Sequence, residues 1–231
     1  MKSEFLNFQN SENQRLIRSF GRIKSRKLSD HKSYLLKDFL PKYEIKFDDI
    51  LDKSLSKNIL EIGFGFGDFL FEKAKNNPNS QFYGFEPHLN GIVNLLGKLE
   101  KNLLNNIKIS TQDVRLALTN FADNFFDEIY ILFPDPWPKT KHFKRRLINE
   151  DFLDNFLAKK LKNDGTLIIT TDHDSYKIWI LKSLLNSNKF SWLANSKQDW
   201  QEFPDNWTFT KYQKKAAKEG RISIILKAKK I

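Results

Sequence analysis

Short apolar runs rich in β-branched and aromatic residues alternate with longer helical patterns through the middle of this 231-residue sequence. Such runs predict buried parallel strands, and the spacing of the segments between them predicts helices. We expect strands at 58–62, 81–85, 107–110, 128–133 and 166–170, and helices at 67–75, 89–104, 149–161 and 175–185. This alternation predicts a doubly wound α/β domain with a mostly parallel sheet. Two later runs, 190–195 and 222–227, are expected to close the sheet edge, one of them antiparallel.

The first 45 residues differ in character from the rest of the chain. They contain no strand signal, are rich in Lys, Arg, Ser and Asn, and predict a basic arm followed by a short helix near 34–40. Arms of this composition are often ordered only when a partner binds. We therefore expect a basic N-terminal arm with its short helix at 1–45, and one α/β domain at 46–231.

The composition removes several classes of enzyme. The sequence has no cysteine, which excludes disulfide scaffolds, cysteine zinc sites, iron–sulfur clusters and thiol nucleophiles. Any catalysis must therefore use oxygen and nitrogen groups, and we expect no metal. Mean hydropathy is -0.55, and neither a spanning apolar run nor an apolar signal core is present. We expect a cytoplasmic protein without membrane contact.

Positive charge is concentrated in three windows, 15–32, 139–146 and 211–230. They hold 20 of the 39 basic residues but only 2 of the 28 acidic ones, so their net charge is +18 and that of the remaining chain is -7. Basic patches on a mildly acidic body are typical of a protein that binds a polyanion, because counterion release from phosphates drives binding. We favour nucleic-acid binding over the alternative that these windows are only solvated faces.

The first predicted strand leads into a glycine-rich turn. Gly63, Gly65 and Gly67 let the backbone turn tightly and approach a ligand at the carboxyl edge of the sheet. A nicotinamide dinucleotide fingerprint needs a third glycine three places after the second, where this chain has Asp68 or Leu70, depending on the frame. The turn therefore predicts a nucleotide-like ligand of another kind.

Three carboxylates lie at or beside the ends of successive predicted strands. Glu61 stands just inside the glycine turn, Glu86 ends the second strand, and Asp113 follows the third. These acids suit, in turn, a cationic amino-acid end, the two hydroxyls of a ribose, and the amine of an adenine. Each acid alone is more often a solvated or capping residue, but together they describe S-adenosylmethionine. The pattern resembles the class I methyltransferases, which implies a single Rossmann-like domain.

A proline-rich loop, Phe133-Pro134-Asp135-Pro136-Trp137-Pro138, follows the fourth strand. Its three prolines fix the backbone, so Asp135 and Trp137 are held at the carboxyl end of the sheet with little entropy left to lose. The alternative is that the prolines only end the strand and Trp137 only packs. The basic run at 139–146, interrupted by Phe143, suits phosphate contacts combined with base stacking.

Four segments together resemble the bacterial tRNA (guanine-N7)-methyltransferase family. They are EIGFGFG at 61–67, FPDPWPKTKHFKRR at 133–146, the Thr171-Asp172 pair, and TKYQ at 210–213. The resemblance extends over nearly the whole chain, including RSFGR at 18–22. It implies an enzyme that transfers a methyl group from S-adenosylmethionine to N7 of guanine-46 in the tRNA variable loop.

The resemblance also implies roles for individual residues. The cofactor-binding positions are Glu61, Gly63, Glu86, Asp113 and Asp135, of which Asp135 is also the catalytic position. The substrate-binding positions are Lys139, Asp172, Thr210, Lys211, Tyr212 and Gln213. The RNA-contacting segment is Lys141, His142, Phe143, Lys144, Arg145 and Arg146.

Guanine N7 already has a free lone pair, so this reaction needs positioning and charge stabilisation rather than a base. We expect Asp135 to orient the guanine through its N1 and N2 hydrogens and to stabilise positive charge, with Asp172 as a second guanine-side partner. Lys139 would anchor a neighbouring phosphate or ribose. Trp137 would offer a stacking surface to a base turned out of the tRNA.

The chain departs from the family pattern at two positions. Gln213 stands where the family usually has Glu. Its amide can still form a hydrogen bond but carries no charge. His173 stands where the family has an aromatic residue. Two rival functions stay open: a methyltransferase that acts on another RNA base, an exocyclic amine or a protein side chain, and a non-catalytic RNA-binding module on a Rossmann scaffold. The expected partner is tRNA, and the expected assembly is a monomer or homodimer.

Overall fold

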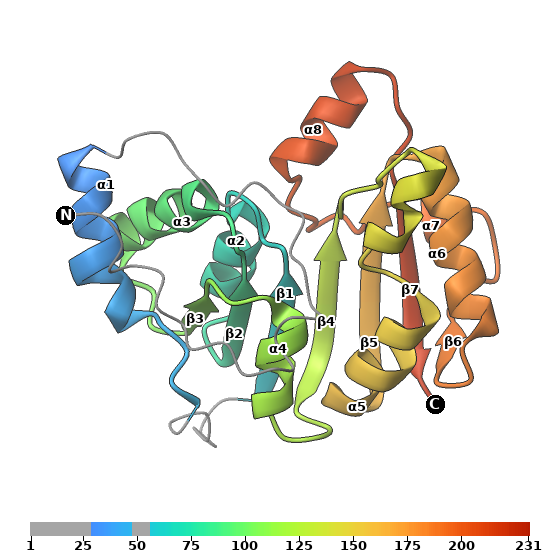
Figure 1. The fold of residues 1–231 in the computed structure, drawn as a ribbon, viewed down its shortest axis with the longest axis horizontal. Coiled ribbons are helices and arrows are strands. Elements are labelled where there is room, and N and C mark those ends of the chain that lie inside the picture. The colour runs from blue at the N-terminus through green and yellow to red at the C-terminus, as the bar shows by residue number, and fades with distance from the viewer. Residues whose placement is uncertain (1–28, 48–55) are drawn as a thin grey trace.

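Seven strands form one sheet in the middle of the molecule (Figure 1). The structure, a computed structural model, describes residues 29–47 and 56–231. Residues 1–28 of the predicted basic arm therefore lie outside the described residues. The strands are β1 (Lys57–Ile62), β2 (Ser80–Phe85), β3 (Ile107–Ser110), β4 (Phe126–Leu132), β5 (Leu161–Thr171), β6 (Phe190–Trp192) and β7 (Ile224–Lys230). Their order is β3-β2-β1-β4-β5-β7-β6.

The sheet is parallel from β3 to β5, and β7 runs antiparallel to both of its neighbours. The doubly wound fold and its antiparallel strand are therefore confirmed. The antiparallel strand lies one place in from the edge, because β6 pairs with its outer side. All five predicted strands of the parallel part are present; four agree with the expected bounds within two residues, and β5 begins five residues earlier than expected.

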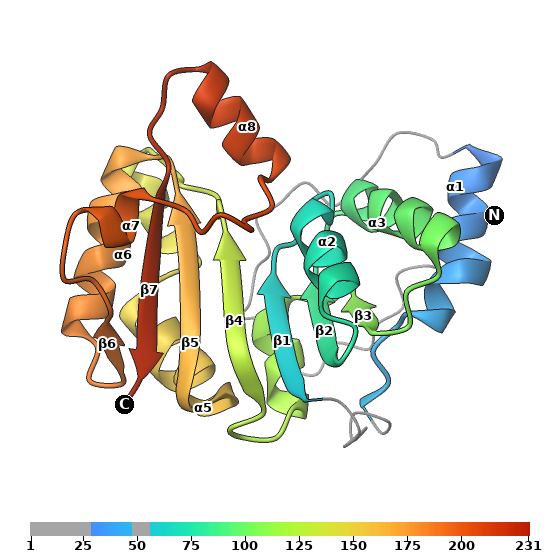
Figure 2. The same cartoon turned by 180° about the vertical axis from the view of Figure 1, so that it is seen from behind.

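Helical segments cover both faces of the sheet (Figures 1 and 2). The α-helices are α1 (Asp30–Tyr34), α2 (Asp68–Asn76), α3 (Leu89–Asn102), α4 (Val114–Ala117), α5 (Ala158–Lys160), α6 (Asp174–Asn186), α7 (Gln198–Gln201) and α8 (Lys211–Lys218). The 3₁₀ and π-helical turns are η2 (Leu35–Phe39), η3 (Leu40–Lys42), η5 (Leu118–Asn120), η6 (Thr140–Arg145) and η7 (Phe152–Leu157). Within the described ranges, no helix is long and apolar enough to cross a membrane.

The strands divide their side chains between two hydrophobic cores, as the two-residue period of a strand requires. On β1, Ile59 packs into the core that α2 and α3 cover, and Leu60 into the core beneath η7 and α6. On β4, Tyr130 and Ile129 divide in the same way. Burial on both faces explains why these strands read as near-continuous apolar runs.

The strand β5 begins earlier than the sequence predicts. We expected a helix to end at residue 161 and a strand to begin at residue 166, but β5 already begins at Leu161 and includes the turn-forming sequence Asn163-Asp164-Gly165. The register between β4 and β5 shifts at this point, and Asp164 adopts φ 63. Residues 163–165 therefore form an irregular part of β5, where the pairing with β4 changes register. The preceding helix ends at Lys160.

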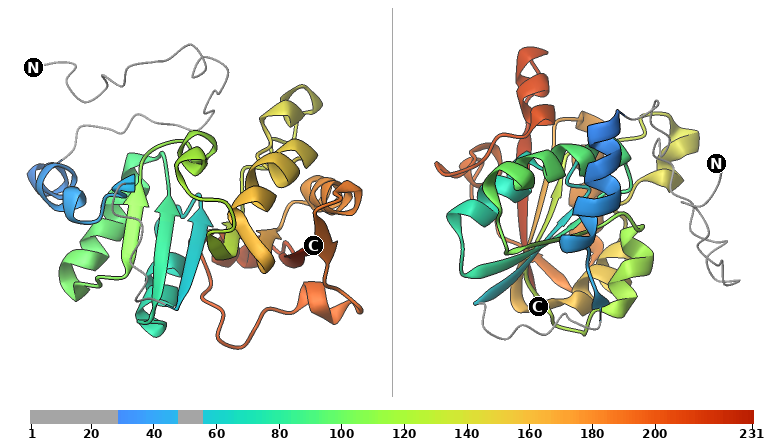
Figure 3. Two further views of the ribbon diagram at one scale, coloured as in Figure 1. Left: turned by 90° about the horizontal axis from the view of Figure 1, so that it is seen from below. Right: turned by 90° about the vertical axis from the view of Figure 1, so that its left-hand side faces the viewer.

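The short helix expected near residues 34–40 is present and packs on the flank of the domain (Figure 3). Leu35, Phe39 and Tyr43 are buried in the core that α3 and β3 share. The backbone at Ile45 donates to the carbonyl of Ile109 at 3.0 Å, and Ile109 donates to Tyr43 at 2.7 Å. Residues 43–45 thus pair with the outer edge of β3.

The topology places a site between β1 and β4. From β1 the chain adds β2 and β3 on one side, and then returns to add β4 and β5 on the other. Ligands of open α/β sheets bind outside the carboxyl ends of the strands at such a switch point. The loops that follow these strands carry the glycine turn and the proline-rich loop.

Candidate active site

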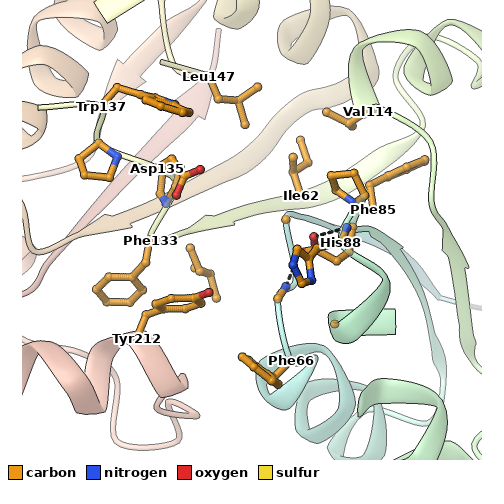
Figure 4. Close-up of a pocket in the computed structure, with 18 of the residues that line it drawn as sticks. Ile62, Phe66, Phe85, His88, Val114, Phe133, Asp135, Trp137, Leu147 and Tyr212 are labelled. Carbon is orange, nitrogen blue, oxygen red and sulfur yellow. Dashed lines mark hydrogen bonds between the residues drawn. The ribbon is translucent and has the colours of Figure 1, made fainter. Parts of the chain in front are cut away.

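A cavity of about 680 Å³ opens at the carboxyl ends of the parallel strands (Figure 4). The glycine turn after β1 and the segment after β2 form one side of it. The proline-rich loop after β4, the end of β5 and the helix α8 form the other. The fold therefore brings together segments that lie far apart in the sequence, from Gly63 to Tyr212.

The glycine turn exposes its backbone to this cavity. Gly63, Gly65 and Gly67 have φ values of +73°, +54° and +71°, which glycine adopts without strain. The first residues of α3 lie close against this turn: a Cβ on Gly91 would come within 2.2 Å of the carbonyl oxygen of Gly65. Gly91 therefore allows α3 to pack against the glycine turn, although no motif of the sequence identifies this residue.

Glu86 connects the glycine turn to the segment that follows β2 on this side of the cavity. One carboxylate oxygen accepts the N–H of Gly65 and the other accepts the N–H of His88, both at 2.8 Å (Figure 4). Burial raises the pKa of Glu86, and the two backbone donors oppose that change. The side chain lines the cavity with its position fixed, as binding of a diol requires.

Glu61 lies at the end of β1 and does not line the cavity. Its side chain is buried, and its Oε2 atom finds no hydrogen-bond partner among the described residues. Burial, followed by the nearby carboxylates of Glu86 and Asp68, raises the pKa of Glu61 to about 8. A carboxyl group in this state is largely protonated at neutral pH.

Asp113 lines the cavity from the end of β3 and begins the helix α4. Its Oδ1 accepts the backbone N–H of Arg115 at 3.0 Å, and the Arg115 guanidinium binds both carboxylate oxygens, at 2.9 and 2.6 Å. This bidentate pair fixes the orientation of the acid. Arg115 also lines the cavity and was not predicted, because only the helix cap brings it onto Asp113.

The proline-rich loop holds Asp135 inside the cavity (Figure 4). Phe133 and Trp137, on either side of the acid, have φ values of 53° and 40°, which are costly for residues with a side chain. The N–H of Phe133 donates to the carbonyl and to the hydroxyl of Thr170, at 3.0 and 3.2 Å. The Asp135 side chain is exposed toward the open cavity, and desolvation by the protein on its other side raises its pKa.

An acid and an aromatic residue complete the far side. Asp172, directly after β5, is paired with Arg221, and its Oδ2 lies 2.5 Å from the guanidinium Nε. The ring of Tyr212 on α8 reaches across to the glycine turn, 3.5 Å from where a Cβ on Gly65 would lie. Burial and the nearby carboxylates raise the pKa of Tyr212.

The sequence matches one methyltransferase family over most of its length. The family described as "Putative methyltransferase" (Methyltransf_4) matches residues 56–225. A tRNA (guanine-N(7)-)-methyltransferase of Rhodopseudomonas palustris is 33% identical over 216 residues, which cover 90% of this chain and 84% of the relative. Another from Zymomonas mobilis is 34% identical over 211 residues, which cover 88% and 90%. The chain belongs to the tRNA (guanine-N7)-methyltransferase family.

Solved methyltransferases share the fold of this family member. "Structure of an Antibiotic Related Methyltransferase" aligns with a TM-score of 0.55 and 19% identity, covering 81% of this chain and 96% of that chain. The antibiotic-resistance methyltransferase Kmr aligns with a TM-score of 0.57 and 13% identity, covering 81% and 93%. At these identities the likeness shows the fold alone, and it agrees with the predicted class I methyltransferase architecture.

The other predicted substrate residues of this methyltransferase lie around the cavity or behind it. Thr210 caps α8 by accepting the N–H of Gln213 at 3.2 Å, and the Lys211 ammonium lies 4.1 Å from the centre of the Phe66 ring. Gln213 is buried, accepts a hydrogen bond from Trp207 at 3.0 Å, and is not among the residues that line the cavity. His173, at the start of α6, does line the cavity.

The basic run at 139–146, which contains Lys139 and the predicted RNA-contacting segment 141–146, divides into surface and interior residues. Lys139, Lys141 and Lys144 are exposed, and the guanidinium of Arg145 lies 4.9 Å from the centre of the Trp137 ring. His142 meets the same ring edge-on at 5.8 Å, and Phe143 packs on Trp179. Arg146 is 3% exposed, and its guanidinium is held inside the protein.

Proposed function

We propose that this protein transfers the methyl group of S-adenosylmethionine to N7 of guanine in tRNA, at position 46 of the variable loop. The observation that carries the proposal is the placement of Asp135. Its carboxylate lines the same cavity as the glycine turn and Glu86 on one side, and Asp172 and Tyr212 on the other. The names of the relatives support the choice of tRNA and of guanine N7.

The residues on the glycine side fit S-adenosylmethionine. The turn offers bare backbone at Gly63, where even a Cβ would meet no atom of the described residues within 4 Å, so a ligand has room to lie against it. Glu86 is fixed for the ribose hydroxyls, and Asp113 for the adenine amine. Glu61, at the end of β1 just before the turn, would face the cationic amino-acid end, whose positive charge would favour the ionised form of this buried carboxyl. Its Oε2 atom has no hydrogen-bond partner in the part of the chain that the structure describes.

When bound, the cofactor supplies a methyl group activated on a cationic sulfur. Guanine N7 needs no deprotonation, so the protein has to hold the base and accommodate positive charge. In the proposal, Asp135 binds the guanine N1 and N2 hydrogens, and its negative charge stabilises the positive charge that passes from sulfur to the purine. Asp172 acts as a second acceptor on the guanine side, and Trp137 stacks on the base.

Two basic segments flank the cavity and fit the tRNA backbone. The exposed lysines 139, 141 and 144 lie in the segment that follows Trp137, and α8, on the same side of the cavity as the proline-rich loop, adds exposed lysines 211, 214, 215 and 218. A nucleotide turned into the cavity would leave its neighbouring phosphates near both segments. We further propose that residues 1–45 assist tRNA binding, that residues 46–231 form the methyltransferase domain, and that the enzyme works in the cytoplasm.

The proposal is tested by incubating the protein with methyl-labelled S-adenosylmethionine and unmodified tRNA, and then identifying the labelled nucleoside after digestion. The expected product is N7-methylguanosine, and a tRNA with adenosine at position 46 should accept no label. Label in another nucleoside would show a different RNA methyltransferase. The absence of both cofactor binding and label would show a non-catalytic module.

A further inference from the structure

Arg146 is the last basic residue of the 139–146 segment, and the structure places it inside the protein. Its side chain is 3% exposed, whereas the neighbouring Lys144 lies on the surface. The guanidinium Nε donates to the carbonyl of Pro136 at 2.9 Å, and Nη2 donates to the hydroxyl of Ser175 at 3.0 Å. These bonds direct the guanidinium away from any RNA on the surface.

Aromatic rings enclose the same guanidinium. Its carbon lies 3.7 Å from the centre of the Phe143 ring, 4.9 Å from that of Tyr176 and 5.1 Å from that of Trp179. Arginine stacks on such rings while keeping a planar set of donors, which lysine does not. A buried cation with this enclosure is held in one orientation.

The two hydrogen bonds of Arg146 join the two loops that carry the guanine-side acids. Pro136 directly follows Asp135, and Ser175 lies in the first turn of α6, three residues after Asp172. The β4 end of the proline-rich loop is already held by the bonds from Phe133 to Thr170. Arg146 supplies the anchor on the other end.

This anchor explains how the loop keeps its conformation. A positive φ at Trp137 costs free energy, so the surrounding structure has to hold the chain there. The bond to the Pro136 carbonyl acts on the peptide group between Pro136 and Trp137. Losing this anchor would let Trp137 relax and would move Asp135 with it.

We propose that Arg146 is a positioning residue for methyl transfer, which fixes Asp135 relative to Asp172 and makes no contact with tRNA. The inference rests on the proposed function of Asp135. A displacement of about 1 Å in a catalytic group is enough to lower a rate by about 100-fold. The inference therefore predicts a loss of rate without a loss of binding.

The test compares Arg146→Lys and Arg146→Met with Lys101→Met, which removes an exposed charge at the end of α3, outside the cavity. Single-turnover methyl transfer at saturating cofactor and tRNA should fall by about 30- to 100-fold in both Arg146 variants. Their tRNA affinity, its salt dependence and their cofactor affinity should stay within about twofold of the parent, and Lys101→Met should match the parent in rate and in binding. An Arg146→Met protein with a reduced salt dependence and a parental single-turnover rate would overturn the inference.

Hydrogen exchange at the amides of Asp135 and Trp137 gives a readout that needs no activity. Exchange there should be faster in the Arg146 variants than in the parent, and unchanged in Lys101→Met. If the Arg146 variants do not fold, Ser175→Ala removes the Nη2 partner at an exposed position, together with a 3.3 Å contact to His173. Unchanged exchange in every folded variant would overturn the positioning role, whereas an inactive parent would refute only the proposed function.

Discussion

The carboxylate of Asp172 is paired with the guanidinium of Arg221, 49 residues later in the chain. Asp172 follows β5 at the sheet edge, and Arg221 comes shortly after α8, so the pair ties this helix to the rim of the cavity. The Asp172 side chain is 19% exposed and Arg221 also contacts Glu219. The acid that we place on the guanine side is therefore oriented by a residue outside every motif of the sequence.

Removing this partner should weaken the reaction with tRNA and spare the cofactor. We expect Arg221→Met to lower kcat/KM for tRNA by about tenfold, because Asp172 loses its fixed orientation. The cofactor affinity should stay within about twofold of the parent, because Glu86 and Asp113 are untouched. Lys214→Met removes an exposed charge from α8, the helix that precedes Arg221, and serves as the control. Equal losses in the two variants would show that only net charge matters.

The close approach of α3 to the glycine turn gives a matched pair of substitutions. Gly91→Ala places a Cβ 2.2 Å from the Gly65 carbonyl oxygen and 2.9 Å from the Glu86 Cγ. We expect it to lower the free energy of unfolding by about 1 to 3 kcal/mol and to weaken cofactor binding about tenfold or more. Gly97→Ala lies on the same helix, and its new Cβ would meet no atom within 4 Å in the part of the chain that the structure describes, so it should stabilise the protein by about 0.5 to 1 kcal/mol. Urea unfolding and calorimetry measure both effects.

The buried carboxyl of Glu61 should make stability depend on pH. Its pKa is raised to about 8 in the folded protein, from an ordinary value of 4.5, so between these values the folded state holds more protons than the unfolded chain. Stability from this group is therefore fully present below about pH 4.5 and is lost as pH rises toward 8, by about 1 kcal/mol per pH unit.

Glu61→Gln mimics the protonated side chain and isolates this dependence. Its free energy of unfolding should exceed that of the parent at pH 8, and the difference should shrink as the pH falls toward 5. Glu202→Gln changes an exposed glutamate and should leave the profile unaltered. Parallel profiles for Glu61→Gln and the parent would show that Glu61 keeps an ordinary pKa.

The sequence predicts the fold well because each strand of the parallel region is buried on both faces. Residues such as Ile59 and Leu60 face different cores, so the runs are continuously apolar and easy to find. The position of β6 outside β7 depends on pairing between segments that are distant in the sequence, and no local pattern encodes it. The acids after the strands are found for the same local reason, because each follows a clear strand end.

The partners of the site residues are the part that the sequence does not reveal. Arg146 belongs to a basic run whose composition predicts a surface patch. In the structure it is buried against the rings of Tyr176 and Trp179 on α6, a contact that the local sequence does not indicate. Gln213 lies in a matched motif, yet its amide is bonded to Trp207. Both outcomes depend on which face of a short helical segment packs inward.

The exposed lysines in the segment that follows Trp137 should account for part of the salt dependence of tRNA binding. Changing Lys139, Lys141 and Lys144 together to Met should flatten the slope of log affinity against log salt by about 0.7 to 0.9 for each phosphate that these lysines neutralise in the parent complex. Lys75→Met with Lys101→Met changes exposed lysines at helix ends outside the cavity and is the control. A parental slope in the triple variant would show that these lysines are only solvated.

Single-turnover methyl transfer by Asp135→Asn tests the central claim most directly. The variant should keep its fold, its cofactor affinity and most of its tRNA affinity, but transfer methyl groups to guanine N7 about 100-fold more slowly, because the charge facing the cavity is gone. In the parent the rate should fall as the pH is lowered through the raised pKa of Asp135, since protonation removes the same charge, and the Asn variant should lack this acidic limb. An Asp135→Asn enzyme with the parental rate and the parental pH profile would contradict the account and transfer the role to Asp172.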